Sequence, residues 1–137
     1  MTKTAVFSLS TLGAFTFSYF LELTATNFEQ YLATAAVILV DGVFGIMAGI
    51  KREGFITNRA LKIPKTLVFW TILLTVILLV EKSFSGTFWL SETIIAPFLV
   101  FQLVSILKNA SMTGWISNDL LIQLLDKIDQ HKGPREI

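Results

Sequence analysis

The sequence has no cysteine and few charged residues. Without cysteine, the chain can form neither disulfide bonds nor thiolate metal sites, and it has no cysteine nucleophile. Only 15% of the 137 residues are charged, whereas soluble proteins average about 25%. Hydrophobic residues make up 53%, and the mean hydropathy is +0.68. A chain of this length has room for one domain, and these proportions predict an integral membrane protein.

Charge and side-chain chemistry argue against two broad classes of function. A net charge of +1 argues against a nucleic-acid partner, which would demand a strongly basic surface. The one histidine, His131, lies in a polar tail, where it is expected to be solvated. The sequence offers no nucleophile–histidine–acid set, metal-ligand cluster or glycine-rich loop after a strand. We therefore expect a protein that is not an enzyme and that needs no metal or cofactor.

Four apolar segments approach the length of about 20 helical residues that crosses a bilayer. The first three are Thr4–Leu21, Tyr31–Ile50 and Pro64–Val80, and the fourth ends at Leu107, before Lys108. Pro97 lies near the outer end of the fourth segment, so that helix either starts close to Pro97 or bends there. The sequence predicts an all-α integral membrane protein with about four transmembrane helices. Three spans also fit, if the first segment lies at the interface.

Polar stretches separate these segments. Glu22–Gln30 and Glu81–Glu92 are expected to form acidic turns, and Lys51–Lys65 is expected to form a basic loop. Pro64 suits the first turn of the third helix, where its missing N–H is not needed. Gly114 is expected to end the fourth helix.

The last part of the chain predicts an amphipathic helix outside the bilayer. Ser117 or Asn118 can cap this helix, and its apolar side chains fall on one face. They are Leu120, Leu121, Leu124, Leu125 and Ile128. The opposite face is acidic, which favours packing on protein over binding to anionic lipid. The final residues, HKGPREI, predict a disordered tail, and the chain divides into a membrane domain, 1–114, and a cytoplasmic part, 115–137.

Cations concentrate on one side of the predicted membrane domain. The basic loop carries five cations and one acid, and a further cation ends the fourth segment. The positive-inside rule therefore places this loop and both termini in the cytoplasm. The cations that determine this topology are Lys51, Arg52, Arg59, Lys62, Lys65 and Lys108.

Asp41 interrupts the apolar second segment. It precedes Lys51 by ten residues, which places it about 15 Å from the cytoplasmic boundary on a helix. An acid near the bilayer midplane costs roughly 2.5–3.5 kcal/mol, so it is expected to face protein or water, as a packing or a titrating group. Small residues on the same helix face permit close helix approach. The predicted helix-packing and self-association face comprises Asp41, Gly42, Gly45, Ala48 and Gly49.

Two polar stripes are candidates to line a water-filled lumen. The first segment carries Ser8, Thr11 and Ser18 on one face, and the fourth carries Gln102, Ser105 and Asn109. Each stripe could instead be structural, with hydroxyls bonded to their own helix or polar groups joining helices within one subunit. Gln102 is also a candidate hydrogen-bond partner for Asp41. Its distance from Lys108 places it at a different depth unless the helices tilt or end at different depths.

Two stretches resemble a known family. Residues 41–65, DGVFGIMAGIKREGFITNRALKIPK, resemble the signature of the phage holins that include clostridial phage holins and holin-like toxin-release proteins. The matching positions are Asp41, Gly45, Ile46, Ala48, Lys51 and Lys62. Residues 101–128 resemble the downstream pattern of the same family, with matches at Ser105, Ile106, Leu107, Asn109 and Gly114. Gln102 and Lys108 depart from the pattern, because the family often has Glu there.

The resemblance implies a holin of the cytoplasmic membrane of a bacterial host. Such a protein accumulates during phage infection, forms homo-oligomers and opens lesions in the lipid bilayer. The lesions release a cell-wall hydrolase or collapse the membrane potential, and no direct contact with the hydrolase is implied. Two other functions fit the composition: a small proton-coupled transporter or channel that uses the membrane acid, and a structural membrane protein of a virion or envelope assembly.

Overall fold

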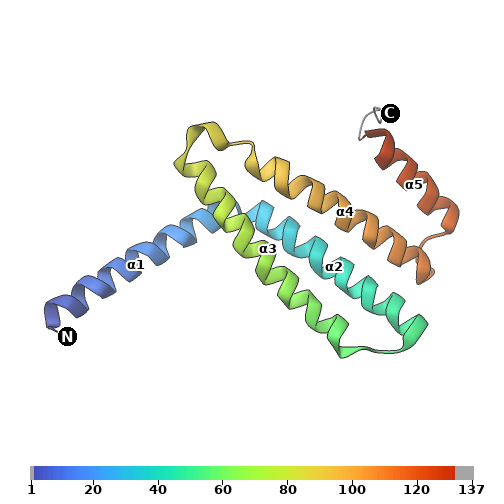
Figure 1. The fold of residues 1–137 in the computed structure, drawn as a ribbon, viewed down its shortest axis with the longest axis horizontal. Helices are drawn as coiled ribbons and strands as arrows, with labels where there is room; N and C mark the ends of the chain where they lie inside the picture. Colours follow the sequence, from blue (N-terminus) through green and yellow to red (C-terminus); the bar gives the residue numbers. More distant parts are fainter. Residues whose placement is uncertain (1, 132–137) are drawn as a thin grey trace.

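The computed structural model describes residues 2–131, which form five α-helices and one short 3₁₀ helix (Figure 1). The elements are α1 (Lys3–Thr26), α2 (Phe28–Glu53), α3 (Thr57–Ser83), η1 (Ser85–Thr87), α4 (Leu90–Met112) and α5 (Asn118–His131). Four of the helical segments are long and apolar enough to cross a membrane. The predicted all-α fold with a C-terminal helix is confirmed, and the tail from residue 132 lies outside the described residues.

Helices α2, α3 and α4 form a three-helix bundle. α2 packs against both α3 and α4, and α3 also contacts α4. α1 contacts the bundle only near its C-terminal end and projects away from it (Figure 1). Every residue of α1 as far as Ser18 is exposed. α1 is therefore an apolar helix with almost no partner inside the subunit.

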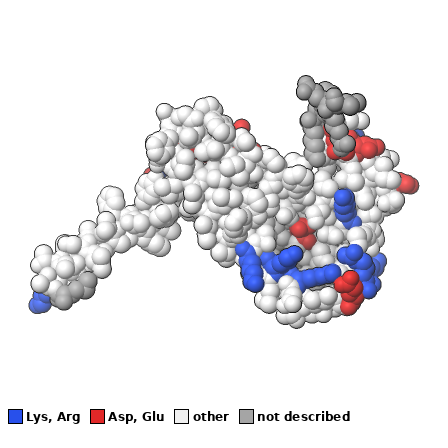
Figure 2. Space-filling view, in the orientation of Figure 1, with Lys and Arg blue, Asp and Glu red and all other residues white. Residues whose placement is uncertain are grey.

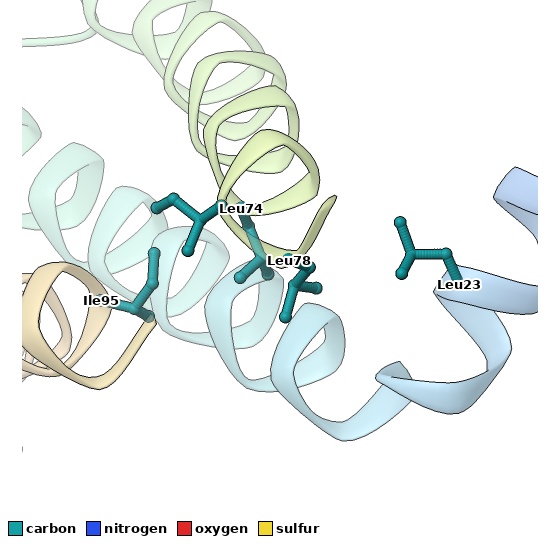
Figure 3. Packing of buried hydrophobic residues seen from close by; sticks show 5 residues of the cluster. Leu23, Leu74, Leu78 and Ile95 are labelled. Atoms are coloured by element: carbon teal, nitrogen blue, oxygen red, sulfur yellow. The ribbon is translucent and has the colours of Figure 1, made fainter. Parts of the chain in front are cut away.

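The hydrophobic core lies where α1 meets the bundle. Leu74 of α3 lies beside Ile95 of α4, and Leu78 of α3 and Leu23 at the end of α1 belong to the same cluster (Figure 3). Leu23 is 2% exposed and Leu74 is fully buried. Trp70 and Phe98 add a stacked pair between α3 and α4, with ring centroids 3.5 Å apart. This core fixes one end of the bundle.

The prediction of an acidic turn at Glu22–Gln30 is wrong. The chain stays helical on both sides of Asn27, and only Asn27 separates α1 from α2. Its side-chain amide donates a hydrogen bond to the Leu23 carbonyl at 2.9 Å. Thr26 likewise donates to the Glu22 carbonyl at 2.8 Å. Polar side chains are satisfied by the helix itself here, so their presence does not require a loop.

The prediction of a basic loop is also wrong, because most of residues 51–65 are helical. α2 continues to Glu53, α3 begins at Thr57, and only residues 54–56 lie outside a helix. Gly54 makes the turn, with φ +81 and ψ −178, a conformation essentially restricted to glycine. Pro64 lies inside α3 rather than in its first turn. Proline is tolerated there because neighbouring groups in membrane helices can satisfy the backbone that it leaves free.

The fourth helix starts before Pro97 rather than close to it, and it extends beyond its predicted end at Leu107. It begins at Leu90, so Pro97 lies within it, and it continues past Lys108 to Met112. Glu81 at the end of α3 supports the start of α4, because its carboxylate accepts a hydrogen bond from the Ser91 N–H at 2.6 Å. The predicted turn before α4 contains η1 and is shorter than expected.

Gly114 ends α4 as predicted. Its φ is +84, and its N–H donates to the Ser111 carbonyl while the Trp115 N–H donates to the Ala110 carbonyl. This pair of hydrogen bonds is a Schellman motif, in which glycine accommodates the left-handed backbone. Ser117 then caps α5, since its hydroxyl accepts the Leu120 N–H at 3.2 Å.

The apolar face of α5 is turned toward α4 without being buried. Leu124 and Ile128 of α5 line an apolar cleft of about 840 Å³ with Val100 and Leu103 of α4. No residue of α5 is fully buried. The predicted amphipathic helix is therefore present, and its packing on protein is loose within the subunit.

Candidate functional site

Cations gather at one end of the bundle, where α2 turns into α3 and α4 ends. We call this the basic end, and Figure 2 shows its Lys and Arg side chains with an acidic group close by. The opposite end carries Glu22, Glu29, Glu81 and Glu92, and we call it the acidic end. The helical course of residues 57–65 explains this arrangement, because it lays the cations of α3 alongside the second half of α2.

A polar cleft of about 280 Å³ opens between the three helices at the basic end. Its polar lining combines Asp41 of α2 and Gln102 of α4 with three side chains of α3. Its apolar lining comes from Ile38, Ile46 and Ile63. The three polar side chains of α3 are Arg59, Lys62 and Thr66. The cleft thus joins one acid, one amide, one hydroxyl and two cations from separate helices.

Asp41 and Gln102 line the same cleft, in line with the expected alternative that the helices end at different depths. α4 runs on to Met112, whose carbonyl lies 3.5 Å from the Lys51 ammonium at the end of α2. α2 and α4 are therefore aligned so that Asp41 and Gln102 line one cleft.

The two side chains, which are candidate hydrogen-bond partners by sequence, do not form a hydrogen bond with each other. Oδ1 of Asp41 and Oε1 of Gln102 are both buried, and in the described part of the chain neither has a hydrogen-bond partner. A buried acceptor without a donor costs about 1–3 kcal/mol. The cleft therefore contains two acceptors that a ligand or water could satisfy.

The two cations of the cleft differ in their partners. Arg59 forms an ion pair with Glu53 at 2.8 Å, and their side chains are 40% and 55% exposed. An exposed pair of this kind contributes little to stability. Lys62 is exposed and has no ion-pair partner among residues 2–131. The cleft therefore has an unpaired ammonium at its surface and unpaired acceptors in its wall.

The predicted glycine face lies against other helices of the same subunit. A Cβ at Gly42 would come within 2.5 Å of the Ile63 side chain, and one at Gly49 within 2.5 Å of Nη1 of Arg59. A Cβ at Gly45 would lie 3.7 Å from Nδ2 of Asn109. Ala48, on the same helix face, is only 1% exposed, so its methyl group is already enclosed by neighbouring side chains. These residues allow α3 and α4 to approach α2 closely.

The polar stripe of α4 also lies within the subunit. Gln102, Ser105 and Asn109 are all half-buried. The Asn109 amide donates to the Ser105 hydroxyl at 3.5 Å and faces Gly45 of α2. In this arrangement the stripe contributes to the α2–α4 contact.

Comparison with known proteins identifies the family. The bacteriophage holin family matches residues 18–130, which is most of the chain. The chain belongs to the bacteriophage holin family. Proteins of this family are non-enzymatic membrane proteins, and this holin-family chain is a multi-pass member. No curated protein and no solved structure shows significant similarity to it.

The family match covers the bundle and α5 but begins near the end of α1. Most of α1 therefore lies outside the region that the holin family defines. Ser8 donates to the Thr4 carbonyl and Thr11 to the Phe7 carbonyl, each at 2.8 Å, and Ser18 is exposed. The two bonded hydroxyls satisfy their own helix, and all three residues remain on a free surface.

The remaining cations that are predicted to determine the topology lie around the cleft rather than in it. Lys51 reaches the end of α4, where a cation is favoured by the helix dipole. Arg52, Lys65 and Lys108 are exposed. Sequence analysis did not identify Thr66 and Ile63 as cleft residues. The spacing of Arg59, Lys62, Ile63 and Thr66 was the available signal, because it places them on one helix face once the segment is treated as helical.

Proposed function

We propose that this protein is a holin that assembles in the cytoplasmic membrane of a bacterial host and permeabilises it. The lesions would give a cell-wall hydrolase access to the wall, or would activate it by collapsing the membrane potential. The family match over residues 18–130 carries this proposal. It favours a holin over the proton-coupled transporter and the structural membrane protein that the composition also allows.

The charge distribution supports one orientation of the bundle. Cations at the basic end favour the cytoplasmic side, and the acids of the other end favour the outer side. The chain then crosses outward in α3 and inward in α2 and α4. α5 follows α4 on the cytoplasmic side, and α1 returns the N-terminus to the cytoplasm if it spans the bilayer.

α1 is the surface that we propose for self-association. The glycine face of α2 is already used within the subunit, so subunits would have to open before that face could join them. α1 instead exposes large apolar side chains along its length, with Phe7 at 72% and Phe15 at 78%. Its hydroxyl face would line water in the assembled lesion, and its apolar side chains would contact lipid or neighbouring copies.

Controlled expression in a bacterial host tests this function. Expression with a cytoplasmic cell-wall hydrolase should cause an abrupt loss of culture turbidity, and expression alone should collapse the membrane potential without lysis. A catalytically inactive hydrolase is the matched control, because it leaves the membrane lesion unchanged. A protein that changed only proton flux in a graded manner, with no sudden loss of potential, would contradict the holin proposal. The Asp41→Asn variant adds a test of titration, since a carrier would lose its flux and a holin would retain a lytic event.

A further inference from the structure

The polar cleft contains opposite charges that do not neutralise each other directly. Asp41 supplies a carboxylate whose Oδ1 is buried, and Lys62 supplies an exposed ammonium. Both line the same space of about 280 Å³, and the described structure contains no ion pair between them. Gln102 adds a second buried acceptor to the wall. The cleft therefore presents acceptors inside and a cation at its mouth.

This arrangement specifies the chemistry of a complementary ligand. The buried oxygens of Asp41 and Gln102 require N–H or O–H donors, and Asp41 also favours a positive charge. Lys62 requires an anionic group, and Arg59 retains donors beyond the one that it gives to Glu53. A zwitterion with an ammonium and a phosphate a short distance apart satisfies both sets. A simple anion or a simple cation satisfies only one.

Arg59 and Lys62 line the cleft together with Asp41, so the level of the lipid headgroups lies nearer to Asp41 than its distance from Lys51 alone predicts. The uncharged part of α3, Thr66–Val80, has 15 residues, which rise about 22 Å. A hydrocarbon core is about 30 Å thick, so the bilayer has to thin or its phosphates have to approach the level of the cleft. Lys62 lines the cleft, so a headgroup drawn to it reaches the buried acceptors.

We propose that this cleft binds the headgroup of a phospholipid with a primary ammonium, such as phosphatidylethanolamine. The phosphate lies against Lys62 and Arg59, and the ammonium donates hydrogen bonds to Asp41 and Gln102. Each charge of the zwitterion then meets an opposite charge of the protein, and both buried acceptors gain donors. The inference concerns the folded subunit in a membrane and does not depend on lytic activity, so the two can fail separately.

Native mass spectrometry of the full-length protein in detergent tests the proposal. The protein is titrated with three phospholipids that have identical acyl chains: phosphatidylethanolamine, phosphatidylcholine and phosphatidylglycerol. Phosphatidylcholine keeps the phosphate and the positive charge but has no N–H donor, and phosphatidylglycerol has no ammonium. We expect phosphatidylethanolamine to bind about tenfold more tightly than either, because only its ammonium can donate hydrogen bonds to the charged Asp41.

Variants assign the preference to the cleft. Asp41→Asn should remove most of the preference for phosphatidylethanolamine, and Lys62→Gln should weaken binding of all three lipids. Lys65→Gln is the matched control, because Lys65 is an exposed cation of the same helix outside the cleft. The affinity of Lys65→Gln for each lipid should stay within about twofold of that of the unmodified protein. Circular dichroism of each variant confirms that the helices are retained.

Three results would overturn the proposal. Equal affinity for phosphatidylethanolamine and phosphatidylcholine would show that the ammonium donors are not recognised. Stronger lipid binding by Asp41→Asn would show that Asp41 and Lys62 pair with each other in the membrane. Competition by soluble O-phosphoethanolamine as effective as that of the lipid would assign the cleft to a free metabolite instead of the bilayer.

Discussion

Gly42 gives α3 room to lie against α2. The Ile63 side chain occupies the space that a Cβ would need. Any larger residue at position 42 therefore has to displace α3 or force Ile63 into another rotamer. Gly49 faces the guanidinium of Arg59 in the same way, although that flexible side chain can move aside more readily. Small residues therefore matter here because they set the width of the polar cleft as well as the packing of the bundle.

Replacing Gly42 with leucine should destabilise the bundle by about 1–3 kcal/mol, the usual cost of overpacking. The matched control is Gly13→Leu in α1, where no atom lies within 4 Å of an added Cβ. Thermal unfolding in detergent, followed by circular dichroism, should show a lower midpoint for the first variant than for the second. Equal midpoints would mean that α2 and α3 are not in close contact at this position.

At the scale of the helix, α1 and α2 differ in where their polar groups find partners. Tyr31 of α2 shares a hydrogen bond of 2.7 Å with Thr75 of α3, and thus joins two helices. The bonded hydroxyls of α1 reach only their own backbone, as for Thr16 and Leu12 at 2.9 Å. α1 therefore has a weakly polar face. Exposing this face to lipid costs little free energy, because its hydroxyls are bonded to their own helix, and the face remains available to water.

If that face lines a lumen, cysteines placed on it should become accessible when the lesion opens. Ser8→Cys, Thr11→Cys and Ser18→Cys should react with a charged methanethiosulfonate after lysis is triggered, and react slowly before. Leu9→Cys and Phe17→Cys are matched controls, because each lies next to a test residue and points about 100° away from it. The absence of native cysteine makes each label specific. Reaction at equal rates on both faces would contradict a lumen formed by α1.

For the whole molecule, the separation of charge between its two ends is the strongest guide to its orientation. The cations of α3 extend into a helix beside α2, so the basic end includes Lys62 and Lys65 as well as the turn at Gly54. The bundle that crosses the membrane therefore has many cations at its basic end, and the hydrophobic core lies at its acidic end. α1 leaves the bundle at the acidic end.

Single cysteines labelled with a membrane-impermeant maleimide in intact cells test this orientation. Ser85→Cys at the acidic end should react from outside. Gln130→Cys in α5 should react only after the membrane is opened. Lys3→Cys should behave like Gln130→Cys if α1 spans the bilayer, and like Ser85→Cys if α1 lies at the outer interface. External labelling of Gln130→Cys would contradict the proposed topology.

The sequence by itself determined the class of protein, the helices and the side of the molecule that is basic. These features depend on composition, on the length of apolar runs and on local signals such as Gly114 and Ser117, which act within a few residues. The resemblance to phage holins likewise rested on the order of residues along the chain, and the family match supports it.

Only the tertiary structure decided which polar groups share a site. The basic segment looked like a loop because charges are common in loops, yet its residues are helical and turn back beside α2. That change places Lys62 in one cleft with Asp41 and Gln102, the two residues that the sequence already offered as hydrogen-bond partners. The alignment of α2 with α4 depends on helix ends and packing across the bundle. No local pattern in the sequence encodes that distance, and so the cleft could not be predicted.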